Sequence, residues 1–376
     1  MDIQSGPFSY ENWKAQINGV QSYEAYEFPL YTDARIVGEI TSGYGPYQFL
    51  NTVLFTTTPI LAPSIVLRAE YAVSFDYGAG LPEKTDVEIY HGGLLNDEMA
   101  ALLALCLGIR LKSGGYTRHF RHGGDPRGNP TAFETSRNLI LPLPVGLSVI
   151  APRLLGERSL EQAEPLKYFP LLASDGAIAL VKAARQYQDG VWIIESQPEL
   201  AWLMLVSSLE TAAFYWRSSK EAPVERLRAS QPKLEKLLKD ECGQALLEKV
   251  SDLIAPYMGA TKKFVDFVLE FLPLPPQERP PKPFQHAWDR QNIKETLEII
   301  YDWRSKALHG GTPFPMPMCM PPLRVEGSFA EIPTGLATKS RGGVWLAKDT
   351  PVNLHSFEYI TRNVLLKWWS SLSKGA

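Results

Sequence analysis

Two residues near the end of a predicted helix carry side chains suited to chemistry at a phosphate. The segment RQNIKETLEIIYDWRSKALHGG places Arg304 and His309 in an R-x4-H pattern, directly before Gly310 and Gly311, which predict a left-handed cap at the end of the helix. An imidazole with an ordinary pKa of ~6.5 exchanges a proton at neutral pH, so His309 is suited to act as a general acid or base. A guanidinium stays charged and matches a phosphate with two parallel hydrogen bonds, so Arg304 is suited to hold a phosphate and its developing charge.

Helix geometry limits how these two groups meet. Residues five positions apart on an ideal helix lie ~7.5 Å apart along the axis and ~140° apart around it. We therefore expect the last turn to unwind at Gly310, so that both groups reach one cleft. The alternative needs no substrate: Arg304 pairs with a neighbouring carboxylate, and His309 caps the last carbonyls of its own helix.

A third candidate is an isolated carboxylate. Glu210 is the only charge after Glu199 in the segment ELAWLMLVSSLETAAFYW. A helix that is apolar almost all round is buried, and a buried carboxylate needs a partner. We hypothesise that Glu210 contacts Arg304 and orients its guanidinium; the alternative is a rim position from which Glu210 faces water.

The sequence around this motif resembles the HEPN family, and most closely its Apea-like branch. Besides YDWRSKALHGG, the segments SSLETAAFYW, TKKFVDFV and SFEYITRNVLLKWW occur in the order of that branch, so the resemblance covers about residues 165 to 372. It implies a helical bundle that dimerises, so that two R-x4-H motifs face one composite cleft. Many relatives act in defence against phage or as toxins.

The resemblance also implies a reaction. Relatives cleave RNA without a metal: the ribose 2′-hydroxyl attacks the adjacent phosphate and leaves a 2′,3′-cyclic phosphate and a 5′-hydroxyl. Arg304 and His309 would be catalytic, Glu210 would orient Arg304, and neither a metal nor another cofactor is expected. Ser305 and Lys306 are candidate RNA contacts; the alternatives are a small packing serine and a solvated lysine.

A second group of candidate RNA contacts lies in a glycine-rich segment, KSGGYTRHFRHGGDPRGNP. It is the densest basic segment of the chain and contains Arg118, Arg121 and Arg127. Glycine lets backbone amides approach phosphates, which favours an RNA-binding loop. The alternative is a plain solvated loop.

Composition bounds the protein class. The chain of 376 residues has 38 basic and 41 acidic residues, so any RNA contact must be local rather than spread over a basic surface. Cys106, Cys242 and Cys319 are far apart and form no CxxC pair, which disfavours a disulfide framework or a zinc site and favours a reducing cytoplasm. We see neither a signal peptide nor a membrane-spanning run, and expect a soluble protein.

The chain divides into two unequal parts. From about residue 20 to 92, short β-branched and aromatic runs predict strands, and LLNDEMAALLALCLGIRL, capped by Asn96, predicts the helix that closes this region. From about Asp175, long amphipathic segments predict helices, including a continuous one over KLEKLLKDECGQALLEKV. The expected fold is α+β, with a β-rich N-terminal domain (1–164) and an all-α HEPN bundle (165–376).

Two functions fit this pattern. The first is an endoribonuclease that acts as a homodimer, with the N-terminal domain, whose role is unassigned, sensing a trigger or restraining the nuclease. The second is a catalytically silent RNA-binding or partner-binding module that keeps the bundle as a dimerisation device. Substituting His309 by Ala separates the two, because only the nuclease depends on that imidazole.

Overall fold

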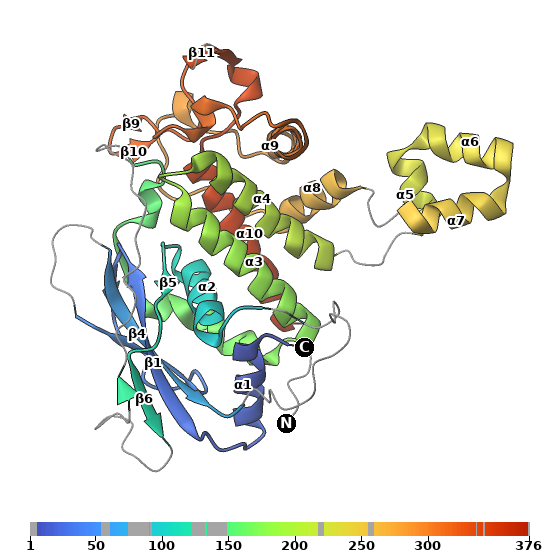
Figure 1. The fold of residues 1–376 in the computed structure, drawn as a ribbon. Coiled ribbons are helices and arrows are strands. Elements are labelled where there is room, and N and C mark those ends of the chain that lie inside the picture. Colours follow the sequence, from blue (N-terminus) through green and yellow to red (C-terminus); the bar gives the residue numbers. More distant parts are fainter. Residues whose placement is uncertain are drawn as a thin grey trace.

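Short β-rich segments of the first half of the chain form an antiparallel sheet (Figure 1). The computed structural model describes residues 6–53, 61–73, 90, 92–121, 132–133, 149–216, 222–254, 259–335, 337–340 and 343–374. Neighbouring strands follow the order β3, β4, β1, β6, β7, and β5 also pairs with β1. Their bounds are β1 (Glu24–Thr32), β3 (Tyr47–Asn51), β4 (Ala62–Tyr71), β5 (Lys112–Ser113), β6 (Arg118–Arg121) and β7 (Ala132–Phe133).

The register places a row of large apolar side chains on one face of the sheet. Phe28 lies opposite Leu67, which lies opposite Phe49, and all three are buried. The helices α1 (Phe8–Ile17) and α2 (Leu95–Leu107) lie against the sheet in Figure 1. Cross-strand packing of this kind requires a cover that excludes water, which these two helices supply.

Two details of this region differ from the sequence predictions. The basic segment expected as a loop contributes β6, because Arg118 forms an ion pair with the buried Glu27 of β1 and its backbone pairs with that strand. The sheet is therefore completed after α2 rather than closed by it. Asn96 is not the helix cap: α2 begins at Leu95, and the Asn96 amide donates to Ser113 Oγ at 2.9 Å.

Long helices dominate the second half of the chain, which confirms the α+β fold class. This half is not all-α as predicted, because short strands lie between residues 324 and 346. In Figure 1, α3 and α4 run beside each other, with α10 alongside them. The small residues Gly190 and Ala183 let α3 and α4 approach closely; a Cβ at Gly190 would lie 3.2 Å from Met204 Cβ. The helices are α3 (Ser174–Ile193), α4 (Pro198–Trp216), α8 (Ala260–Glu270), α9 (Arg290–Gly310) and α10 (Leu354–Lys374).

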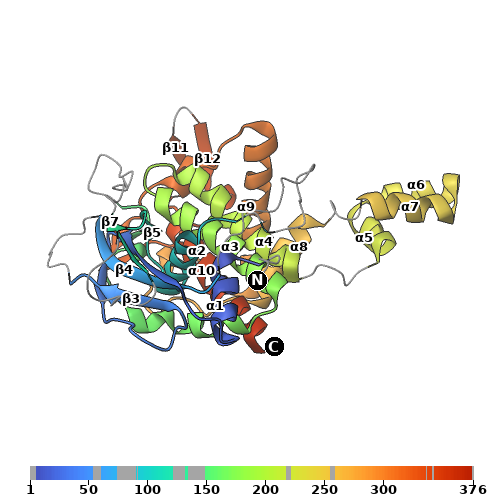
Figure 2. The ribbon, with the colours of Figure 1, turned by 60° about the horizontal axis from the view of Figure 1, so that its bottom comes forward.

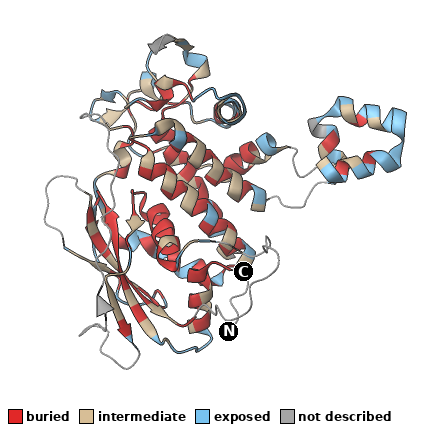
Figure 3. Ribbon diagram, in the orientation of Figure 1, coloured by how far each residue is buried: buried red, intermediate tan, exposed pale blue. Residues whose placement is uncertain are grey.

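Three short helices form an arm that projects from the rest of the molecule (Figures 1 and 2). The predicted continuous helix is broken at Gly243, whose φ of 76° reverses the chain between two of them. Most of the arm is exposed in Figure 3, and Leu227 and Leu247 form its small buried centre. Its helices are α5 (Pro223–Ser230), α6 (Pro232–Cys242) and α7 (Gln244–Ile254).

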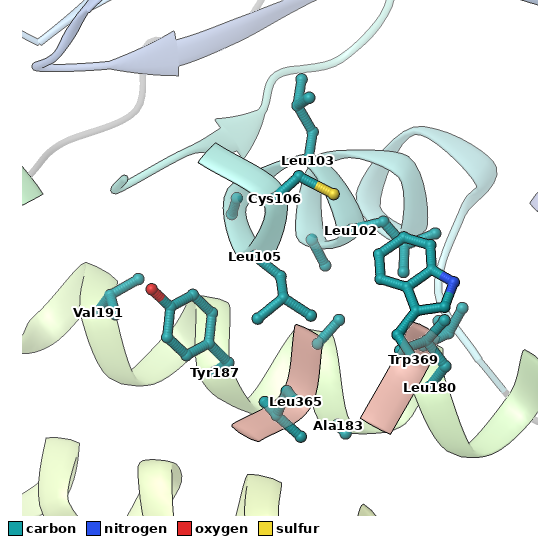
Figure 4. Close-up of a cluster of buried hydrophobic side chains, with 14 of the residues drawn as sticks. Leu102, Leu103, Leu105, Cys106, Leu180, Ala183, Tyr187, Val191, Leu365 and Trp369 are labelled. Carbon is teal, nitrogen blue, oxygen red and sulfur yellow. The ribbon is translucent and has the colours of Figure 1, made fainter. Parts of the chain in front are cut away.

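The sheet region and the helical region share one apolar core. Leu102 and Leu105 of α2 pack against α3 on one side and against Leu365 and Trp369 of α10 (Figure 4). The guanidinium of Arg362, on α10, donates to the carbonyls of Leu105 and Cys106 and so caps the end of α2. The core is therefore continuous across the predicted boundary at residue 164.

A buried ion-pair network reinforces this junction. Arg110, which follows α2, is 1% exposed; its Nε lies 3.0 Å from Asp33 Oδ2 and its Nη1 3.2 Å from Glu195 Oε1. Glu195 also accepts the backbone N–H groups of Ile150 and Ala151. A buried cation is tolerated because two carboxylates neutralise it and fill its hydrogen bonds.

None of the helices in the described ranges has both the length and the apolar character that a bilayer crossing requires.

Smaller elements connect these layers. The remaining strands form three two-stranded pairs: β2 (Arg35–Val37) with β8 (Glu157–Ser159), β9 (Arg324–Val325) with β10 (Ser328–Phe329), and β11 (Ala337–Ser340) with β12 (Gly343–Leu346). The 3₁₀ segments are η1 (Pro152–Leu154), η2 (Leu160–Leu171), η4 (Lys282–Phe284), η5 (Met316–Cys319) and η6 (Ala347–Asp349).

Candidate active site

The helix α9 carries the R-x4-H motif at its C-terminal end. It begins at a cap in which Asp289 Oδ1 accepts the N–H of Asn292 at 3.0 Å. Ile293, Leu297 and Ile300 are fully buried and anchor one face of the helix in the core. Their spacing continues to Arg304, which therefore lies at the edge of the packed face.

Glu210 of α4 meets Arg304, as the sequence hypothesis expected. Arg304 Nη2 donates to Glu210 Oε2 at 2.8 Å, and Tyr301 Oη donates to Glu210 Oε1 at 2.7 Å. The side chains of Arg304 and Glu210 are 21% and 20% exposed, so the pair sits at the boundary between core and solvent. Its orienting role in catalysis stays a prediction.

Tyr301 completes the cluster around this carboxylate. Its ring lies under the guanidinium, with 5.4 Å between Arg304 Cζ and the ring centroid. Burial, followed by the hydrogen bond to Glu210, raises the pKa of Tyr301, so the phenol remains a donor. Arg304 is thus held by one ion pair and one aromatic face, while its Nε is buried and has no hydrogen-bond partner among the described residues.

A pocket of about 750 Å³ adjoins Arg304. Its apolar lining includes Ile178 and Ala179 of α3, Ala213 of α4 and Phe264 of α8. Charged and polar side chains surround this lining, namely Asp175, Lys182, Glu210, Thr211, Tyr215, Lys263 and Arg304. A pocket of this size that combines apolar surface with charged and polar side chains is typical of a small-ligand site.

His309 lies in the last turn of α9, exposed to solvent. The helix stays α-helical through Gly310 and ends at Gly311, whose φ of 64° is left-handed. The left-handed glycine cap was correctly predicted, whereas the expected unwinding at Gly310 was wrong. Within one chain His309 therefore remains ~140° around the helix from Arg304, and it does not line the pocket.

The two candidate RNA contacts between them, Ser305 and Lys306, occupy different environments. Ser305 is half-buried on the helix surface. Lys306 Nζ lies 2.6 Å from Asp302 Oδ2 and 4.3 Å from the ring centroid of Trp303. An RNA phosphate would have to compete with Asp302 for this lysine, although both groups are about half exposed and the pair is correspondingly weak.

The basic residues of the N-terminal half lie elsewhere. Arg118 pairs with the buried Glu27, and Arg121 ends β6 in an exposed position. Figure 1 shows β6 and α9 well separated, with α2, α3 and α4 between them. Arg127 lies outside the described residues. The structure therefore does not bring Arg118 or Arg121 to the motif on the same chain.

Other chemistry has less support from the described residues. Within those ranges, no three His, Cys, Asp or Glu side chains gather in a way that could hold a metal ion. Burial in α2 raises the pKa of Cys106 to about 12, so this thiol is not a ready nucleophile. No family model, curated protein or solved structure matches the chain. The resemblance to HEPN proteins thus rests on the motif and its flanking helices.

Some of the site was missed at the level of sequence. Tyr301 precedes Arg304 by three positions, a spacing that puts both on one helix face and could have pointed to it. Asp175, Lys182 and Lys263 offered no such signal. They come from two other helices, and only the packing of α3, α4 and α8 brings them around one pocket.

Proposed function

We propose that the chain is a metal-independent endoribonuclease of the HEPN type, active as a homodimer. The observation that carries this proposal is the clamped Arg304: Glu210 accepts a hydrogen bond from its guanidinium and the ring of Tyr301 lies against it, at the mouth of a pocket. A guanidinium fixed before substrate binds costs little reorganisation when charge develops on a phosphate.

The exposed surface around the motif supports a second copy. Leu308 follows Arg304 by one helical turn and is 50% exposed. A large apolar side chain exposed beside a polar site is typical of an interface. A second α9 would bring its own His309 to the cleft, which compensates for the separation of Arg304 and His309 within one chain.

The proposed reaction needs only groups of the chain and the RNA. One imidazole removes the proton of the 2′-hydroxyl, and the 2′-oxygen attacks the adjacent phosphorus. The bond from phosphorus to the 5′-oxygen breaks, and a protonated imidazole, that of the second copy, gives the leaving oxygen its proton. Arg304 binds the non-bridging oxygens, whose negative charge grows in the transition state. A cytoplasmic location and a role in defence or as a toxin belong to the same proposal.

The ion pair also favours a second candidate. Since Glu210 already neutralises Arg304, and His309 points elsewhere on the same chain, the cluster suits a silent bundle that binds RNA or a partner without cleaving it. Such a module would keep its partner binding when His309 is replaced. A nuclease would lose its activity.

The experiment that tests the proposal is incubation of a labelled RNA with the protein in EDTA, followed by analysis of product ends. We expect 2′,3′-cyclic phosphate and 5′-hydroxyl ends, and a loss of cleavage by 10²-fold or more, on the order of one acid–base group, in His309→Ala and Arg304→Ala. Lys294→Ala, an exposed change on the same helix, serves as the matched control. Cleavage that disappears in EDTA, or that persists in both variants, rules the mechanism out.

A further inference from the structure

The pocket beside Arg304 is complementary to a nucleotide, because polar groups lie at its two ends and apolar side chains lie between them. At one end lie Glu210 and Arg304. At the other lie Tyr215 and Asp175: Tyr215 is five residues further along α4, roughly 7.5 Å along its axis, and burial and the hydrogen bond to Asp175 raise its pKa. A cation end and a carboxylate end on one floor favour a ligand that is anionic at one end and donates hydrogen bonds at the other.

The lining between these ends suits a flat ring. Ile178, Ala179 and Ala213 present small or branched apolar surfaces, and Phe264 is fully buried beneath them. Phe214 lies at the rim and is 62% exposed, a position from which its ring can stack on a base. Pockets of about 300–1,000 Å³ accept ligands of this size, and the cavity beside Arg304 measures about 750 Å³.

Two lysines add positive charge to the pocket. Lys182 of α3 and Lys263 of α8 line it together with Arg304 of α9, so the three cations come from three helices. Lys263 Nζ lies 5.4 Å from the ring centroid of Phe214, which puts positive charge beside the exposed aromatic rim. A phosphate bound at Arg304 would therefore be flanked by further positive charge, as phosphate sites generally are.

We infer that this pocket binds the nucleobase next to the scissile phosphate and that Asp175 selects bases carrying an exocyclic amine. The inference rests on the proposed function and adds a base preference to it. A carboxylate accepts N–H donors, which the edges of adenine, cytosine and guanine present as amino groups. Uracil presents two carbonyl oxygens beside its single N–H, so its edge repels the Asp175 carboxylate.

A binding assay isolates the pocket from catalysis. Trinucleotides with 2′-O-methyl groups lack the hydroxyl that attacks the phosphate, so they bind without being cleaved. Their fluorescence anisotropy is measured with adenosine, cytidine, guanosine and uridine versions. We expect the uridine version to bind about tenfold more weakly than the others, as for the loss of one charge-assisted hydrogen bond. Wild-type protein without this difference contradicts the inference.

Two variants and a control locate the preference. Asp175→Asn keeps an acceptor for Tyr215 but loses the charge, and should remove the discrimination against uridine. Phe214→Ala should weaken all four trinucleotides by about tenfold, because a stacking surface is lost for every base. Asp252→Asn, an exposed change on the projecting arm, should behave as the wild type. An Asp175→Asn protein that still discriminates tenfold overturns the role of this carboxylate.

Two further experiments separate the proposed base preference from a free-nucleotide site and from the nuclease activity itself. Free 5′-monophosphates of adenosine and uridine are titrated: Asp175-dependent binding as tight as that of the trinucleotide assigns the pocket to a free nucleotide, and much weaker binding assigns it to RNA. Cleavage ends from a random RNA pool are then sequenced. If Asp175→Asn cleaves with an unchanged base profile, the base preference is refuted and the nuclease proposal is not. If the protein binds the bases selectively but cleaves no RNA, the nuclease proposal is refuted and the base preference is not.

Discussion

Replacing Glu210 by Gln tests whether the clamp on Arg304 serves the chemistry. The carboxylate accepts from Tyr301 at 2.7 Å and from Arg304 at 2.8 Å. A glutamine keeps the shape and one acceptor oxygen. Its NH₂ group, however, is a donor and faces either the Tyr301 hydroxyl or the Arg304 guanidinium, which is also a donor. Hydrogen bonds to charged groups contribute about 1.5–3 kcal/mol when buried, and exposed ion pairs contribute about 0–1 kcal/mol. With a fifth of each charged side chain exposed, we expect a loss of about 2 kcal/mol.

That loss can be checked without any assumption about activity. The entropy of unfolding is roughly 2.1 cal/mol/K per residue, so for a chain of 376 residues the loss lowers Tm by roughly 2–3 °C. Tyr301→Phe removes one of the two donors and leaves the ion pair, so it should lower Tm by about half as much. Differential scanning calorimetry resolves both shifts. Glu298→Gln, which alters an exposed carboxylate 3.8 Å from Lys294 on the same helix, should leave Tm unchanged.

The catalytic consequence is a separate measurement. A misplaced guanidinium binds RNA almost as well but no longer meets the developing charge, so we expect kcat to fall about 10- to 100-fold while KM changes little. Steady-state cleavage of a fluorescent RNA gives both constants. A destabilised Glu210→Gln protein that retains its full kcat shows that the clamp is structural only. A protein unchanged in both Tm and kcat means that the contact does not form in solution.

Three further predictions concern the fold. Glu98 is buried and accepts two backbone N–H groups at the start of α1; burial raises its pKa to about 7. The pKa of Glu98 is higher in the folded than in the unfolded chain. Its contribution to the free energy of unfolding, about 3 kcal/mol, is therefore fully present below pH ~4.5 and is lost as the pH rises through 7. Calorimetry at pH 5 and 8 should show a smaller drop in Tm for Glu98→Gln than for the wild type, and equal drops would contradict the shift. Gly108→Ala should cost about 2 kcal/mol in urea unfolding, because φ is 63° and the new Cβ would lie 2.6 Å from Arg362 Nε; an unchanged midpoint would show that Arg362 is not needed as a cap. Arg110→Met should cost about 3–5 kcal/mol, since it leaves two buried carboxylates without a cation, and a neutral result in the same assay would mean that water reaches them.

Local rules predicted the parts of the site that depend on one helix. The apolar surroundings of Glu210 implied a partner for its carboxylate, and the structure supplies Arg304. Gly311 adopts the left-handed cap that the pair of glycines suggested. These features follow from side-chain periodicity and from the backbone freedom of glycine, which short segments already contain.

Features set by distant contacts escaped prediction. Gly243 interrupts a segment whose flanking residues favour a helix on both sides, because α6 and α7 pack on each other only if the chain reverses there. Arg118 reads as part of a solvated loop, yet a carboxylate 91 positions away draws its segment into the sheet. Asp175 and Lys182 lie on a helix that was predicted, but their place beside Arg304 depends on how that helix packs.

The cap that Arg362 places on α2 has a consequence for how the chain matures. The guanidinium and the carbonyl of Leu105 that it binds are 257 positions apart. At about 5–20 residues per second, a ribosome takes roughly 13–50 s to add the missing partner. During that interval the leucines of α2 have no α10 to cover them, so the emerging chain needs protection from aggregation. A messenger RNA truncated before the codons for α10 would yield an aggregation-prone fragment rather than an independently folded N-terminal unit.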